Sequence, residues 1–169
     1  MTRLRETPTQ TVGPFFAIML EWPDGDHAVP DGTEGAIWLR GQLLDGAGAP
    51  VPDGLIELWQ AGSDPRFARC RTDPGGHYQF LTTRPVPLPG PDGPQAPHIQ
   101  LSVFARGLLD RLVTRAYLAD DGPFDHDAIL STVDPSVRAR LVAEPDGTGA
   151  GYRFDIHLQG EHETVFFDV

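Results

Sequence analysis

Glycine and proline divide this chain into short segments, and that division limits the folds open to it. Nineteen glycines and 17 prolines lie among its 169 residues, mostly between short apolar runs. Both residues interrupt helices and favour turns, as at residues 52–54 and 73–76. Short apolar segments with frequent turns are typical of an all-β domain, and the length fits one domain.

The segments between the turns carry strand patterning. Residues 152–159 alternate most regularly, with Tyr152, Phe154, Ile156 and Leu158 on one face of the predicted strand. Residues 98–105 and 111–118 are expected to pair as a hairpin. The spacing of the strands predicts a β-sandwich. The other predicted strands cover residues 36–44, 55–60, 77–83 and 165–168.

Two segments fall outside the strand pattern. One short helix is predicted over residues 136–142, with Asp134 as its cap and Pro135 in its first position. Residues 1–35 contain proline-rich turns and no periodic apolar face, which predicts an irregular N-terminal arm that lies on another surface. We expect the arm to be part of the same domain as the sandwich at residues 36–169.

Charge and composition exclude several classes of function. The net charge of -11 leaves no basic surface for nucleic acid. No apolar run approaches the roughly 20 residues of a membrane helix, and the N-terminus lacks the apolar stretch of a secretory signal. The single cysteine, Cys70, suits a reducing compartment and is expected to be inert packing. We therefore expect a cytoplasmic protein that binds neither nucleic acid nor membrane.

Motifs that would form a complete catalytic site are missing. The six histidines show no zinc-binding spacing, and the chain has no nucleophile elbow, phosphate loop or dinucleotide fingerprint. Residues 124–127 and 161–163 combine histidine with acidic side chains, but the first group is expected in a loop before a helix and the second in a solvated turn. The chain is therefore expected to form no metal site from its own residues.

Polar side chains share one face of the predicted hairpin. His98, Gln100 and Ser102 alternate with apolar neighbours on the first strand, and Arg115 does so on the second. If the two apolar faces coincide, Arg115 lies opposite Gln100 or Ser102, on the same face as His98. The face is either solvated or part of a functional site, and His98 alone can be a hydrogen-bonded, half-buried histidine.

Motifs spread over nearly the whole chain resemble the intradiol ring-cleaving dioxygenases. Within that family the similarity is to the α type of subunit, in enzymes that pair an α with a β subunit. No one motif is diagnostic, but their order along the chain is specific. The matching stretches are residues 6–15, which include Thr11-Val12-Gly13-Pro14, residues 55–61, which include Glu57-Leu58-Trp59-Gln60, and residues 96–99, 104–107, 152–156 and 160–168.

The resemblance implies that the iron lies in a partner. In the family, two tyrosines and two histidines of the β subunit hold Fe(3+). At the matching positions this chain has no tyrosine within residues 61–72, Leu88 where the β pattern has the second tyrosine, and Gln100 in place of the second histidine after His98. The resemblance therefore implies an iron-binding β subunit as partner, in αβ units, and no metal bound by this chain.

The resemblance also implies a reaction and a set of substrate-binding residues. The reaction is the O2-dependent ring cleavage of a catechol bearing a carboxylate, in aromatic catabolism. Thr11, Gly13 and Pro14 of the arm, together with Arg115, match positions with which the α subunit lines the substrate pocket. One alternative is a non-catalytic, transthyretin-like β-sandwich binding module. Another is a self-sufficient catechol dioxygenase, which would need its own iron ligands and an N-terminal helical dimerisation segment.

Overall fold

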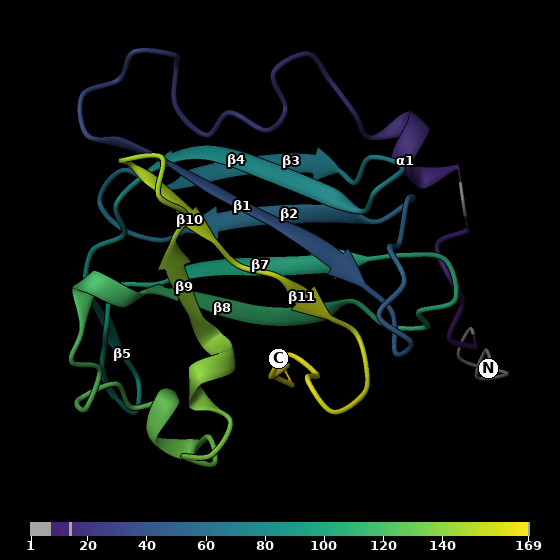
Figure 1. Cartoon of the computed structure of the whole chain (residues 1–169). Helices are drawn as coiled ribbons and strands as arrows, with labels where there is room; N and C mark the ends of the chain where they lie inside the picture. Colours follow the sequence, from purple (N-terminus) through teal and green to yellow (C-terminus); the bar gives the residue numbers. More distant parts are fainter. Residues whose placement is uncertain (1–7, 14, 169) are drawn as a thin grey trace, which may run out of the picture.

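The strands of the computed structural model, which describes residues 8–13 and 15–168, form two layers (Figure 1). In the first layer β1 is central, antiparallel to β4 and parallel to β10 and β11. The second layer is antiparallel throughout, in the order β8-β7-β2-β3. The first-layer strands are β1 (Ala36–Leu44), β4 (His77–Thr83), β10 (Gly151–Arg153) and β11 (Ile156–His157). The second-layer strands are β2 (Leu55–Gln60), β3 (Arg66–Arg71), β7 (Ile99–Phe104) and β8 (Leu112–Leu118).

The main core lies between these layers. Alternate residues of β1 are buried, and its inward side chains meet those of the second layer, as the two-residue period of a half-buried strand requires. A further strand, β9 (Val142–Pro145), pairs with β10 and with β8 and so joins the layers along one side. The predicted all-β sandwich is confirmed. Its largest fully buried core residues include Leu39, Leu43, Phe80, Ile56, Leu58 and Leu101.

Residues 22–29 join the two layers at another edge, between β3 and β4. The backbone N–H of Arg69 on β3 donates to Gly25 at 2.6 Å, and that of Leu81 on β4 donates to Asp26 at 2.9 Å. This part of the arm therefore lies on the sandwich of its own chain and satisfies backbone groups at two strand edges.

The beginning of the arm is much less embedded. Residues 8–12 are exposed, and the backbone N–H of Gly107 donates to the Thr11 hydroxyl at 2.9 Å. A short helix, α1 (Phe16–Met19), follows, and its residues Ile18 and Met19 are largely exposed.

The turn residues marked three strands correctly, and two predictions near the C-terminus are wrong. Residues 36–44, 55–60 and 77–83 are strands, and β7 and β8 pair as the predicted hairpin. Residues 152–159 form two short strands rather than one, because the Asp155 carboxylate accepts the Gln42 backbone N–H at 3.0 Å and replaces a ladder bond. Residues 165–168 make only an isolated bridge, between Phe167 and Val113.

The predicted helix over residues 136–142 is also wrong. Asp134 accepts the Ser136 backbone N–H at 2.9 Å, a local turn rather than a helix cap, and only a 3₁₀-helix, η3 (Arg138–Leu141), follows. Val142 then pairs with Tyr117 of β8. Elements that the sequence pattern did not predict are β3, β9, the small hairpin of β5 (Leu88–Gly90) and β6 (Gly93–Gln95), and the 3₁₀-helices η1 (Ala119–Asp121) and η2 (Leu130–Thr132).

In the described ranges, none of the helices is both long and apolar enough to cross a bilayer.

Candidate functional site

The register of the β7–β8 hairpin places Arg115 directly opposite Gln100. Ile99 and Leu101 are fully buried in the core, so Gln100 between them faces away from the core. Arg115 shares that outer face, as the coincidence of the two apolar faces predicts. On the other side of Gln100 the same row continues to Trp59 of β2.

A cleft of about 520 Å³ opens over this end of the outer face. Gln100 and Arg115 contribute polar groups to it, and two acids, Asp134 and Asp168, also line it. Most of the remaining lining is apolar, so the cleft offers surface on which an aromatic ring can pack. The apolar lining residues are Val113, Ile129, Val133, Val137, Val165, Phe166 and Phe167.

The Arg115 guanidinium is the principal cation of the cleft. Within the described residues, its terminal nitrogen Nη1 is buried without a hydrogen-bond partner, and none of the ion pairs there involves Arg115. Its central carbon lies 5.7 Å from the centroid of the Phe167 ring. Leaving a buried donor unsatisfied costs about 1–3 kcal/mol, so a guanidinium in this state is suited to receive a carboxylate.

His98 lies beside this cation as a neutral, buried imidazole. Only 6% of the residue is exposed, and its Nδ1 lies 2.8 Å from the Ala96 carbonyl oxygen. Because a carbonyl can only accept, Nδ1 must carry the hydrogen. Burial lowers the pKa of His98, and the nearby charge of Arg115 adds to the lowering. The structure therefore agrees with the simpler interpretation of His98, a hydrogen-bonded histidine.

Tyr117 and Asp127 form a buried polar support next to His98. Burial raises the pKa of Tyr117 to about 12, against a smaller lowering by Arg115, so the phenol keeps its proton. The Tyr117 hydroxyl donates to Asp127 Oδ2 at 3.2 Å, and Asp127 also accepts the backbone N–H groups of Ala96 at 2.8 Å and Leu130 at 2.7 Å. Asp127 thus ties three segments together. Its role was not predicted, because residues 124–127 were expected to be a loop before a helix and were considered only as a metal site.

Replacing Asp127 by alanine should destabilise the fold by roughly 2–4 kcal/mol, because it leaves two N–H groups and one hydroxyl without their acceptor. Asp125→Ala is the matched control, since Asp125 is an exposed carboxylate two residues away. The control should change the free energy of unfolding by no more than about 0.5 kcal/mol. Chemical denaturation of both variants measures this difference, and equal effects would contradict the buried role of Asp127.

The residues at the family's ligand positions do not make a ferric site. Leu88 lies in β5, Gln100 lines the cleft, and residues 61–72 form a loop and β3 without any tyrosine. His98 is the one residue that matches, and a neutral amide such as Gln100 is a poor ligand for a hard ferric ion. In the part of the chain that the structure covers, no three His, Cys, Asp or Glu side chains gather as metal ligands, the candidates at 124–127 and 161–163 included.

The remaining predicted site residues lie on the arm, away from this cleft. Thr11 is exposed and bonded to Gly107, and Gly13 has a positive φ of 71°. Neither of them lines the cleft of Arg115. Pro14 lies outside the described residues. One chain therefore does not bring Thr11 and Gly13 together with Arg115 in a single pocket.

Comparisons with known proteins place this geometry in context. A family model described as a dioxygenase matches residues 12–160. Two protocatechuate 3,4-dioxygenase alpha chains are similar over almost their whole length. The one from Burkholderia cepacia is 35% identical, with all of both chains covered, and the one from Pseudomonas putida is 37% identical, with 98% of this chain and 97% of its own covered.

Two other relatives share less of their length. The Burkholderia cepacia beta chain of the same enzyme is 34% identical over 76% of this chain and 66% of its own. The solved structure of a hydroxyquinol 1,2-dioxygenase from Pseudomonas putida superposes with a TM-score of 0.61 at 23% identity and covers 89% of this chain. This chain spans 65% of the length of that protein, and the likeness shows a common fold.

Proposed function

Since the chain belongs to the intradiol ring-cleaving dioxygenases, we propose that it is the α subunit of a protocatechuate 3,4-dioxygenase. The observation that carries this proposal is the similarity to two alpha chains along nearly the whole chain. The similarity to a beta chain stops at two thirds of that chain's length. The similarity to the two alpha chains also disfavours the alternative of a non-catalytic, transthyretin-like binding module.

The proposed division of labour follows from the ligand positions. The family depends on non-haem iron, and we assign the Fe(3+) to a homologous β subunit and none to this chain. The support is chemical: Leu88 and Gln100 replace a tyrosine and a histidine, and residues 61–72 contain no tyrosine. When bound, the iron activates the diol toward O2, and this chain contributes the wall of the substrate pocket at the αβ interface.

In this proposal Arg115 holds the substrate's carboxylate. The unsatisfied nitrogen of Arg115 and the apolar lining of its cleft support that role, because a guanidinium in dry surroundings binds a carboxylate through two parallel hydrogen bonds. The reaction opens 3,4-dihydroxybenzoate between its two oxygen-bearing carbons, adds both atoms of O2, and yields 3-carboxy-cis,cis-muconate. Holding the ring in one orientation is the contribution of this chain to the rate.

We assign the arm residues Thr11, Gly13 and Pro14 to the substrate pocket at the αβ interface, where they would contact the β chain. Residues 8–12 are exposed and do not line the cleft of their own chain, so their surface is available to a second chain even with the Gly107 N–H donating to Thr11. Co-expression of this chain, carrying an affinity tag, with an untagged β-type chain that has all four iron ligands tests the assembly. Equal amounts of both chains should be recovered, and recovery of the tagged chain alone would overturn the proposal.

Deleting residues 1–14 should weaken that assembly or raise KM for protocatechuate. A loss equivalent to one hydrogen bond of about 1 kcal/mol would raise KM about fivefold. The melting temperature of the isolated chain should stay the same, because residues 8–12 are exposed on the sandwich. Size-exclusion chromatography, steady-state kinetics and thermal denaturation measure the three quantities. Unchanged assembly and kinetics would show that the arm has no part in the pocket.

A further inference from the structure

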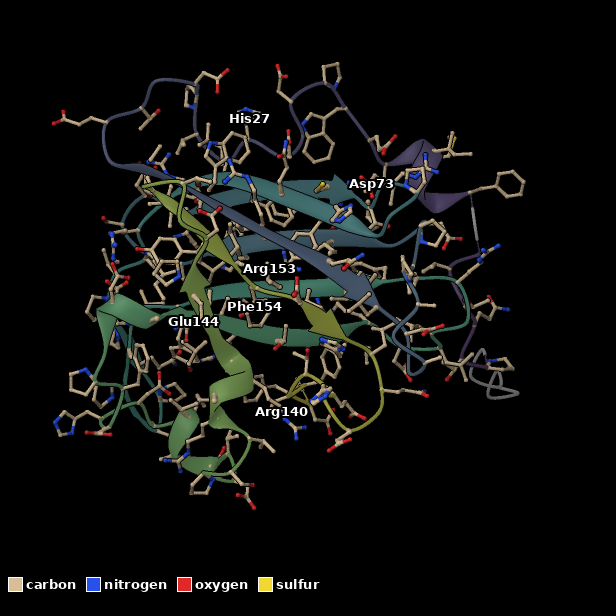
Figure 2. All side chains as sticks on the ribbon, in the orientation of Figure 1. His27, Asp73, Arg140, Glu144, Arg153 and Phe154 are labelled. Atoms are coloured by element: carbon tan, nitrogen blue, oxygen red, sulfur yellow. The ribbon has the colours of Figure 1, made fainter. Side chains whose placement is uncertain are left out.

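Arg115 lies at a gap in the edge of the second layer. Towards the end of β8, Tyr117 and Leu118 pair with β9. Near its start, Val113 forms a bridge with Phe167 of the C-terminal segment. Two separate segments therefore cover the edge of β8 on either side of Arg115, and the Arg115 side chain on the outer face lies beside the C-terminal one. The C-terminal segment lies below β11 in Figure 1, and Figure 2 shows the side chains of the chain in the same orientation.

Backbone contacts hold the C-terminal segment against β8. The N–H of Phe167 donates to the Val113 carbonyl at 2.8 Å, and the fully buried Thr114 donates its hydroxyl to the Val165 carbonyl at 2.7 Å. The Phe167 ring also packs against the second apolar cluster, formed by Tyr117, Leu130, Val133 and Leu141. The ring is therefore fixed in place without any contribution from Arg115.

The Phe167 ring makes a cation–π contact with the Arg115 guanidinium. The separation of 5.7 Å between guanidinium carbon and ring centroid lies within the roughly 6 Å range of a cation–π contact. An aromatic face attracts the cation but accepts few of its N–H bonds, so the donors stay available, as the unpartnered Nη1 illustrates. An acidic partner in the same place would use those donors and neutralise the charge.

We propose that Phe167 is a positioning residue for substrate recognition: its ring holds the Arg115 guanidinium in the orientation that meets the substrate's carboxylate. The inference rests on the proposed function, in which Arg115 binds that carboxylate. Asp134 and Asp168 line the same cleft, so a guanidinium released from the ring has acids with which it can pair. The ring therefore protects the charge of Arg115 as well as its position.

The test uses the assembled αβ enzyme, with protocatechuate and catechol compared as substrates. Phe167→Leu and Phe167→Met remove the aromatic face and keep an apolar side chain, whereas Phe167→Tyr keeps the ring. The ratio of kcat/KM for protocatechuate to that for catechol should fall about three- to tenfold in the Leu and Met variants, the range of a cation–π contact, mainly through KM. The Tyr variant should stay within about twofold of the wild type.

Phe67→Leu is the matched control. The Phe67 ring also faces a guanidinium, that of Arg69 at 5.5 Å from its centroid, but Phe67 does not line the cleft of Arg115. This variant should leave the substrate ratio unchanged. The inference is overturned if the Phe167 variants leave the ratio unchanged while Arg115→Ala lowers it, or if Phe67→Leu lowers it equally. A ratio that Arg115→Ala does not change would overturn both this inference and the proposed role of Arg115.

Discussion

Replacing Arg115 by alanine in the assembled αβ enzyme is expected to lower kcat/KM for protocatechuate by roughly 10- to 150-fold, and that for catechol much less. The range corresponds to about 1.5–3 kcal/mol of transition-state stabilisation, the typical contribution of hydrogen bonds to a charged group. Catechol has no carboxylate, so it loses only the packing of the side chain. The ratio between the two substrates therefore isolates the recognition of the carboxylate.

The expected loss of kcat/KM for protocatechuate is large because Arg115 supplies the positive charge that the anionic substrate needs. The chain carries a net charge of -11, so an anionic substrate needs local positive charge to enter the pocket. Asp134 and Asp168 border the same cleft, which leaves the Arg115 guanidinium as the group that can offset them. A lysine would supply the charge but not two parallel hydrogen bonds, so Arg115→Lys should recover only part of the lost ratio.

Arg111→Ala is the matched control for this experiment. Arg111 is exposed just before β8, and its removal changes the net charge by the same amount. The control should leave the substrate ratio close to that of the wild type. Equal losses on both substrates in Arg115→Ala, with assembly intact, would mean that Arg115 shapes the pocket. Loss of assembly would place Arg115 in a contact with an acidic group of the partner instead.

Local signals in the sequence were sufficient for the main strands. The bounds of β1, β2 and β4 were predictable because turn residues flank clear apolar segments. β3 was missed because its six residues include three arginines and show no regular apolar alternation, and its pairing with β2 is what makes it a strand. The predicted helix is replaced by a local turn at Asp134 and a 3₁₀-helix, and from Val142 onward the chain pairs with β8 instead.

The strand register of the candidate site was predictable from the sequence, but its tertiary contacts were not. The rule that the apolar faces of a hairpin coincide placed Arg115 opposite Gln100 or Ser102, and the observed register selects Gln100. The contributions of Phe167 and Asp127 were not predictable, because Phe167 lies 52 residues after Arg115 in sequence and Asp127 acts through buried hydrogen bonds. Such contacts depend on tertiary packing and leave no periodic pattern in the sequence.

Loss of all dioxygenase activity is expected when this chain is separated from its partner. The reason is the composition of its ligand positions, with Leu88 and Gln100 in place of a tyrosine and a histidine, and no tyrosine within residues 61–72. Tyr117 does not stand at either tyrosine position of the family, and its buried hydroxyl is bonded to Asp127. Restoring single ligands, as in Gln100→His, should not restore activity while the tyrosines are absent.

Iron content, measured together with the visible absorption of tyrosinate bound to Fe(III), tests the central claim most directly. The lone chain, a lone β-type chain and the co-expressed pair are compared after purification in the same iron-supplemented medium. We predict a colourless, iron-free and inactive lone chain, and a red-brown, iron-loaded pair that consumes O2 with protocatechuate. A lone chain that is coloured and active, or a pair that is no more active than the β-type chain alone, would contradict the account.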